Sequence, residues 1–248
     1  MIICKSPAEI EKLRRSGRMA RALLEELRGR TEPGISTLEL ENYLEKRIAQ
    51  LGARPAFKGY RGYPCCLCAS ANNEVIHGIP SERRLREGDI LSLDTGVVVD
   101  GYYGDSAITV PVGEISEPTQ RLLRVTQEAL QLAIEQARLG NRLGDICATV
   151  QRHVEENGYS VVREFVGHGI GRQLHEDPQV PNFGQPGHGP VLKQGMVLAI
   201  EPMVNAGGPA VRVLDDNWTA VTSDGMLSAH FEHMVAVSRN GPDVLTLQ

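Results

Sequence analysis

The chain is 248 residues long, 41% hydrophobic and formally charged at −5, which suffices for a real core in one large domain or two small ones. This acidic balance argues against a broad nucleic-acid-binding face, and no stretch approaches the ~18 consecutive apolar residues of a membrane span. The first ten residues contain no long apolar segment of the kind that directs secretion. We therefore expect a cytoplasmic protein without membrane association or specific nucleic-acid recognition.

Two helices are predicted at the start of the chain. The first covers about residues 7–28, where apolar side chains recur at helical spacing behind the N-cap Ser6. The second begins at a cap formed by Ser36 or Thr37 and ends at Gly52.

The five cysteines form no disulfide pattern, which fits a reducing compartment. Cys65, Cys66 and Cys68 are close in sequence, but no second Cys/His pair stands at zinc-finger spacing, so structural zinc is not expected there.

A β-hairpin is predicted over residues 90–110, because Asp100-Gly101 separates two runs rich in β-branched residues and favours a type I′ turn. With these two residues as the loop, paired positions sum to 201 and Asp94 faces Ala107. Asp105 is then the diagonal neighbour of Asp94 on the same face. Two carboxylates therefore converge.

Such a carboxylate pair is either part of a solvated polar face or a site that holds a cation. The apolar residues around the pair indicate a buried sheet and favour the cation. Gly96 invites a β-bulge, which would shift this register.

A second pair of helices is predicted after the hairpin: one covers about residues 117–138, and after a break at Gly140 the other carries Ile146, Val150 and Val154 and runs to Gly158. Gly34 and Gly140 are 106 positions apart, and so are Gly52 and Gly158. This offset predicts an internal duplication with halves at about residues 1–115 and 116–248. The expected architecture is α+β, with two helix pairs outside a mixed or antiparallel sheet.

The remaining strands are expected in the second half of the chain. The candidates are residues 160–166, 196–203, 210–213, 218–222 and 231–238. Residues 177–193 hold four prolines and three glycines, which is typical of an irregular surface loop.

Further site candidates lie in these later strands. Glu201 ends one apolar strand and Glu232 lies in another, where an unpaired carboxylate would cost several kcal/mol. His168 lies between two glycines after a strand; His77 and His175 are equally compatible with ordinary turn residues. Together with the hairpin aspartates, these oxygen and imidazole groups match the ligands of hard or borderline divalent ions.

The contexts of these residues, SLDTGVVVDGYYGDSA, VGHGIGRQLHEDPQVPNFG, GMVLAIEPMV and FEHMVAV, closely resemble the type I methionine aminopeptidases of the bacterial type. The resemblance covers nearly the whole chain. It implies the pita-bread α+β fold with pseudo-twofold halves, a single catalytic domain spanning residues 1–248, and two divalent metal ions (Co, Mn, Fe or Zn). It also implies a monomer that removes the initiator methionine from nascent chains whose second residue is small, with transient contact at the ribosome exit region.

The resemblance assigns a role to each matching position. Asp94 would hold one metal, Asp105 and Glu232 would bridge both, and His168 and Glu201 would complete the other metal site. The ions would activate a water for attack on the scissile carbonyl.

It also implies the catalytic groups and the substrate pocket. Glu201 would accept the proton of the attacking water, His175 would stabilise the oxyanion, and His77 would contact the leaving nitrogen. The positions that match the methionine pocket are Tyr60, Tyr63, Cys68, Met203 and Trp218.

Three positions depart from the common family pattern. Arg61 replaces a frequent histidine, Leu174 a frequent aromatic residue, and His230 a frequent glutamine, all near the pocket. Substrate specificity and rate are therefore open, whereas the metal ligands are intact.

Two rivals share the implied fold. Prolidases and Xaa-Pro aminopeptidases keep the same five ligands but usually carry an additional N-terminal domain. Metal-free binding proteins of the fold typically lose ligands. The intact ligand set in 248 residues favours the aminopeptidase.

Overall fold

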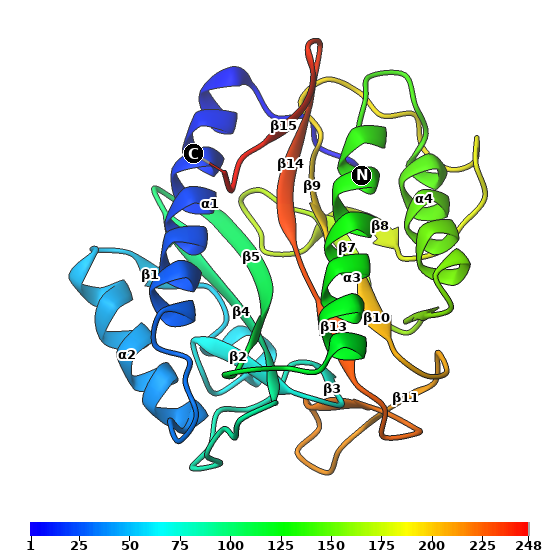
Figure 1. Cartoon of the computed structure of the whole chain (residues 1–248). Helices are drawn as coiled ribbons and strands as arrows, with labels where there is room; N and C mark the ends of the chain where they lie inside the picture. Colours follow the sequence, from blue (N-terminus) through cyan, green and yellow to red (C-terminus); the bar gives the residue numbers. More distant parts are fainter. Residues whose placement is uncertain (248) are drawn as a thin grey trace.

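The computed structural model describes residues 1–247 and contains four long helices in two pairs. Figure 1 shows α1 (Pro7–Arg28) and α2 (Thr37–Gln50) on one side, and α3 (Glu117–Gln136) and α4 (Leu143–Glu156) on the other. Capping boxes at Ser6 and at Ser36 start α1 and α2. In each, the serine oxygen accepts the backbone N–H of the glutamate three residues later, and the carboxylate of that glutamate accepts the backbone N–H of the serine. The predicted starts of the first three helices are confirmed.

The second helix of each pair keeps the sequence offset of 106 that was predicted for the two halves. Adding 106 to the bounds of α2 gives the bounds of α4. Gly52 and Gly158 both have positive φ, 69° and 81°, directly after these helices. One residue further on, Ala53 donates to Ile48 and Tyr159 donates to Val154, so the two helices end in the same hydrogen-bonding pattern.

The hairpin consists of β4 (Ile90–Val99) and β5 (Tyr102–Pro111) in the predicted register. Asp94 pairs with Ala107 and Gly96 with Asp105, which confirms the sum of 201. The expected risk of a bulge at Gly96 is not realised. A Cβ there would lie 2.9 Å from the Phe57 ring, so the glycine makes room for a neighbour.

The strands pair antiparallel throughout the described residues and form four hydrogen-bonded sheets. The hairpin sheet adds β1 (Arg54–Pro55) and β2 (Leu67–Ala71) beside β4. A five-stranded sheet has the order β15 (Gly241–Val244), β14 (His233–Ser238), β9 (Val197–Ile200), β7 (Val166–Gly169) and β8 (Glu176–Pro181). The two small sheets contain β13 (Ser228–His230), β10 (Met203–Asn205) and β6 (Ser160–Val161), and β11 (Val211–Val213), β12 (Ala220–Thr222) and β3 (Glu74–Ile76).

Three expectations for the second half need correction. Residues 177–181 are not loop but belong to β8, which lies at the edge of its sheet, where prolines are tolerated because one side needs no ladder bonds. His168 lies within β7 rather than after a strand. Glu232 precedes β14 and joins the hairpin instead, through a bridge to Ala107.

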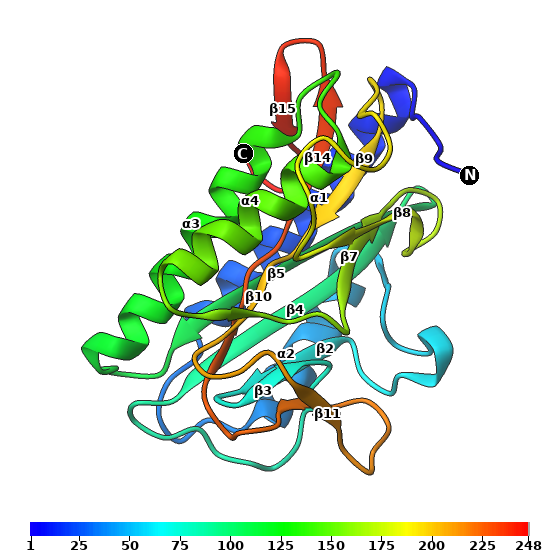
Figure 2. The same ribbon diagram turned by 90° about the vertical axis from the view of Figure 1, so that its right-hand side faces the viewer.

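The helices and the hairpin enclose one large apolar core. Leu23, Leu24 and Leu27 of α1 are fully buried, and α1 packs on both hairpin strands. Figure 2 shows α3 and α4 on one side, β7 and β8 towards the other, and the hairpin strands crossing between them. Among residues 1–247, no helix is long and apolar enough to cross a membrane.

Candidate active site

A cavity of about 240 Å³ opens where the hairpin, β7 and the segment after β9 meet. Its wall includes eleven of the twelve predicted site residues; the exception is Met203. The lining residues that were predicted are Tyr60, Tyr63, Cys68, His77, Asp94, Asp105, His168, His175, Glu201, Trp218 and Glu232.

Four carboxylates from four different segments reach this cavity. Asp94 and Asp105 come from the two hairpin strands, as the register predicts. Glu201 follows β9 directly, and Glu232 is held against the hairpin because its N–H donates to the Ala107 carbonyl at 2.9 Å. Carboxylates about 100 or more positions apart in sequence are therefore brought to one place by strand pairing.

These carboxylates lack partners that would stabilise their charge. Asp94 Oδ1, Asp105 Oδ1 and Glu232 Oε1 are buried and accept no hydrogen bond within the described structure. Burial raises the pKa of Asp94, Glu201 and Glu232 well above the ordinary range, and their mutual repulsion adds to the rise. Burial likewise raises the pKa of Asp105. The cluster is thus short of positive charge.

His168 presents a free lone pair to the cluster. Its Nδ1 lies 3.0 Å from the Gly169 carbonyl, which can only accept, so Nδ1 carries the proton. Nε2 is then unprotonated and lies 3.6 Å from Glu201 Oε1 and 3.8 Å from Asp105 Oδ2. Burial lowers the pKa of His168 to about 3, which keeps the ring neutral.

The donor set fits a divalent metal ion. Ligand atoms of Asp105, His168 and Glu232 all lie within 4.8 Å of one another. Carboxylate oxygens with one imidazole nitrogen are the donors that Mn, Fe, Co and Zn accept. Burial of unpartnered carboxylates is costly unless such a cation compensates it.

His175 lies against His168, with ring centroids 4.2 Å apart, and is oriented by Tyr60. The Tyr60 hydroxyl is 2.8 Å from His175 Nδ1, and the two rings stack. Burial, with a contribution from the Arg61 charge, lowers the pKa of His175 to about 4. When the hydroxyl donates to Nδ1, the proton of this neutral ring is on Nε2, where it is a hydrogen-bond donor.

His77 also lines the cavity and has a left-handed backbone conformation, φ 59°. The following residue fixes this turn: Gly78 sits so close to β2 that a Cβ would lie 2.5 Å from the Ala69 carbonyl oxygen. The His77 ring meets Phe165 and Trp218 edge-on, and burial lowers its pKa to about 4. Non-glycine residues in such rarely populated regions of φ and ψ are more frequent at functional sites than elsewhere.

The predicted methionine pocket is brought together only in part. Trp218 packs edge-on against Tyr63 at 5.1 Å, and Cys68 lies opposite Asp94 in the β2–β4 ladder. Burial raises the pKa of Cys68 well above its ordinary value, so the group remains a thiol. Met203 does not reach the cavity; it is fully buried in a separate apolar cluster with Ile76.

Other lining residues were missed from the sequence. They are Phe57, Ile76, Glu164, Phe165 and Val166. Phe57 had one indirect sequence signal, the glycine at position 96 that its ring requires. Phe165 directly precedes the Val-Gly-His-Gly segment, but nothing in its local pattern separates it from a core residue.

The three departures from the family pattern surround the site. Arg61 and Leu174 line the cavity, and Arg61 lies over the Tyr60 ring with its guanidinium carbon 5.4 Å from the ring centroid. His230 lies behind the wall with Nε2 3.5 Å from Glu201 Oε2. All three are thus placed to affect rate or selectivity.

Comparison with known proteins agrees with this geometry. A family model described as metallopeptidase family M24 matches residues 11–239. A methionine aminopeptidase of Clostridium perfringens is 53% identical over 247 residues, covering 100% of this chain and 99% of that protein. Methionine aminopeptidase 1 of Bacillus subtilis is 52% identical, with 99% of each chain covered. The chain belongs to the methionine aminopeptidases of family M24.

The solved structure of a methionine aminopeptidase from Thermotoga maritima has a TM-score of 0.98 at 47% identity, with both chains fully covered. The chain therefore has the pita-bread fold with pseudo-twofold halves. As an M24 metallopeptidase of the bacterial type I aminopeptidase group, it uses divalent metal at a carboxylate-rich site.

Proposed function

We propose that this methionine aminopeptidase removes the initiator methionine from nascent chains with a small second residue, and that residues 1–248 act as one catalytic domain. The observation that carries the proposal is the group of unpartnered buried carboxylates around the unprotonated Nε2 of His168, inside a cavity of limited size. A cavity of this size would accept the N-terminal side chain of a substrate peptide and the backbone next to it.

Two metal ions would be held by Asp94, Asp105, His168, Glu201 and Glu232, with Asp105 and Glu232 shared between them. When bound, divalent ions there lower the pKa of a water and polarise the scissile carbonyl. Their identity would depend on the supply in the cell, because this donor set accepts Mn, Fe, Co or Zn.

The protein groups divide the remaining work. Glu201 would accept a proton from the attacking water. His175, with Nε2–H free when Tyr60 donates to Nδ1, would donate to the developing oxyanion. His77, which also lines the cavity, would donate to the leaving amide nitrogen. Neutral imidazoles suit both roles, and burial keeps both rings neutral.

Substrate selection would follow from the apolar wall. Tyr63, Cys68 and Trp218 offer an apolar, polarisable surface to the thioether side chain, and Tyr60 contributes next to His175. Met203 would act indirectly, by supporting Ile76, which lines the cavity beside the pocket.

A peptide assay tests the proposal against the rival reaction. Met-Ala-Ser should be cleaved with added Co²⁺, Mn²⁺ or Fe²⁺, whereas Ala-Pro peptides should not. Cleavage of Ala-Pro alone would assign the chain to prolidase-like chemistry and overturn the proposal. Substrates with a bulky second residue, such as Met-Leu-Ser, should be cleaved poorly.

The cellular setting completes the proposal. The enzyme would act in the cytoplasm as a monomer, on N-termini near the ribosome exit region. Sedimentation of the purified protein should give a mass near 27.1 kDa. Twice that value would refute the monomer.

A further inference from the structure

A buried ion pair outside the cavity has no role in the proposed chemistry. Lys5 Nζ donates to Glu176 Oε2 at 2.7 Å, and the two side chains are only 4% and 7% exposed. Burying two opposite charges gives little or no net stability compared with apolar residues, because both must be desolvated. Glu176 also directly follows His175 in the sequence.

The pair is enclosed by backbone on several sides. A Cβ at Gly171 would lie 2.4 Å from Glu176 Oε1 and 2.8 Å from Lys5 Cε. A Cβ at Gly195 would lie 2.5 Å from the Lys5 carbonyl oxygen, and the Lys5 N–H donates to the Gly195 carbonyl at 2.7 Å. Two glycines therefore allow the pair to sit where side chains would exclude it.

Glu176 connects this pair to the turn that carries His175. Its Oε1 accepts the Gln173 N–H at 3.2 Å while Oε2 accepts from Lys5. The start of the same turn is fixed to the hairpin, because the Tyr103 N–H donates to the Gly171 carbonyl at 2.9 Å. Residues 171–176 are thus held at both ends, and His175 lies between them.

The His175 ring has a separate support on the cavity side. Tyr60 stacks on it and lies within hydrogen-bonding distance of Nδ1, which sets the plane and tautomer of the ring. The backbone of His175 is held from outside the cavity, where the Glu176 carboxylate binds Lys5 and the Gln173 N–H.

We propose that Lys5 and Glu176 form a positioning pair that holds His175 at the distance its catalytic hydrogen bond requires. The inference rests on the proposed function, since it presupposes that His175 acts on the oxyanion. Neither residue lines the cavity. Because a displacement of about 1 Å at a catalytic group costs ~100-fold in rate, loss of the pair should lower kcat strongly.

The test compares Lys5→Met, Glu176→Gln and Lys5→Arg in metal-loaded enzyme with Met-Ala-Ser as substrate. The first two should lower kcat by about 10- to 100-fold, with KM and bound metal near the wild-type values. Lys5→Arg keeps the charge and should recover part of kcat. An unchanged kcat in folded Lys5→Met and Glu176→Gln, or loss of metal together with kcat, would overturn the inference.

A second readout does not depend on activity. In metal-free protein, the imidazole ¹H–¹⁵N spectrum should show the Nε2–H form of His175. This signal should shift or broaden in Glu176→Gln. If single variants fail to fold, the double variant Lys5→Met/Glu176→Leu removes both charges, and the same two readouts apply to it.

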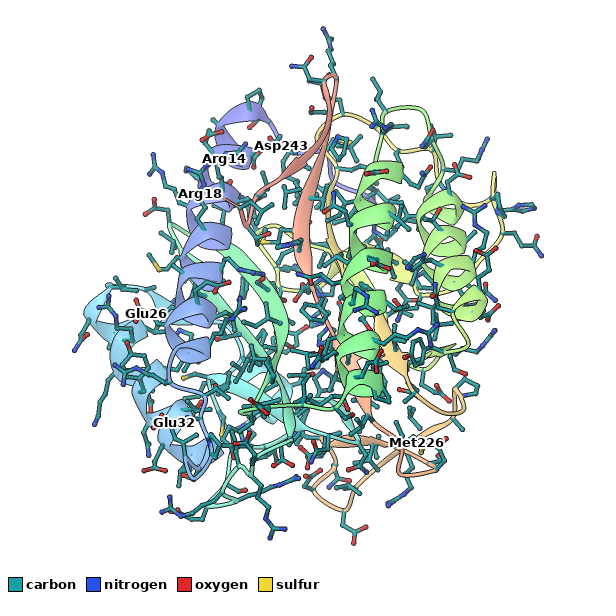
Figure 3. The ribbon with its side chains drawn as sticks, viewed as in Figure 1. Arg14, Arg18, Glu26, Glu32, Met226 and Asp243 are labelled. Carbon is teal, nitrogen blue, oxygen red and sulfur yellow. The ribbon has the colours of Figure 1, made fainter. Side chains whose placement is uncertain are left out.

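A second ion pair offers a matched control. Arg14 on α1 binds Asp243 on β15 with two hydrogen bonds of 2.7 and 3.0 Å, and Figure 3 shows the two side chains together at the edge of the molecule. Arg14→Met should lower stability without changing kcat or the His175 signal. If His175→Ala lowers kcat but the Lys5 and Glu176 variants do not, the positioning role fails while the proposed function stands. A wild-type enzyme inactive on Met-Ala-Ser would instead refute the proposed function.

Discussion

Two buried glutamates, Glu41 and Glu232, are almost equally withdrawn from solvent, with 4% and 2% of the residue exposed. Glu41 uses both carboxylate oxygens, which accept the N–H groups of Cys66 and Leu67 at 2.8 and 2.9 Å. Glu232 Oε1 has no partner within residues 1–247. Burial raises the pKa of both groups; at Glu41 the two backbone hydrogen bonds oppose this rise, whereas at Glu232 the charges of the neighbouring carboxylates add to it.

This difference in hydrogen-bond partners distinguishes a carboxylate that stabilises the fold from one that we propose binds metal. Two backbone amides satisfy Glu41 and tie α2 to the segment that leads into β2. Glu232 and the hairpin aspartates are instead held in place by strand pairing while their charges remain uncompensated, which is the environment that a divalent cation completes.

The largest effect is expected from Asp105→Asn, because this side chain would contact both metal ions. Activity on Met-Ala-Ser should fall by at least about 1000-fold, since metal assistance supplies several kcal/mol of transition-state stabilisation. Elemental analysis should show loss of bound metal, and added Mn²⁺ should no longer raise Tm. Persisting activity in a metal-depleted sample would contradict the metal mechanism.

His175→Ala should act on the reaction and leave the metal in place. Removing one oxyanion donor lowers kcat by about 100- to 1000-fold. Metal content measured on the same sample should match wild type. A variant that loses its metal would show instead that His175 is a ligand.

Glu41→Gln should lower stability and leave metal binding unchanged, the opposite of what is expected for Asp105→Asn. The amide group offers one acceptor oxygen for two N–H donors, so the free energy of unfolding should fall by about 1–3 kcal/mol. Urea denaturation measures this loss, and a metal titration should give the wild-type affinity. Equal stability with weakened metal binding would remove the distinction between the two glutamates.

His233 should make a smaller contribution, to the pH dependence of the free energy of unfolding. Its Nδ1 lies 2.7 Å from the Thr246 hydroxyl. Burial lowers the pKa of His233 from 6.5 to about 4, so the folded chain keeps the ring neutral while the unfolded chain binds a proton below about pH 6.5. The stability linked to this difference is full above that pH and is lost as pH falls towards 4.

His233→Asn should therefore flatten the acid side of the stability profile. Between pH 7 and 5 in the presence of chelator, its loss of unfolding free energy should be smaller than that of wild type by about 1–2 kcal/mol. The other titrating groups are common to both chains and cancel in the comparison. Parallel profiles would show that His233 does not titrate differently on folding.

The elements that sequence predicts best are those specified by local chemistry. Asp100-Gly101 determines the hairpin turn, both residues have positive φ, and the turn alone places Asp94 and Asp105 on one face. Ser6 marks the start of the first helix, and of the two residues predicted as the cap of the second, Ser36 and Thr37, the structure has Ser36.

The features that escaped prediction depend on contacts between distant segments. The prolines of residues 177–181 indicate loop unless it is known that β8 is an edge strand. Met203 has a pocket-like side chain, but pairing with His230 in its small sheet places it behind the wall. Lys5 reads as an ordinary surface lysine near a helix start until the fold brings Glu176 to it.

The proposed metal ligands also differ in when they can meet during folding. Asp94 and Asp105 are joined by one two-residue turn, and pairing of this kind forms early because little chain entropy is lost in closing a short loop. Glu232 reaches Ala107 only after more than a hundred intervening residues are ordered. An emerging chain can thus form the hairpin with two of the five proposed ligands early, and the site is complete only when the segment that carries Glu232 docks on the hairpin.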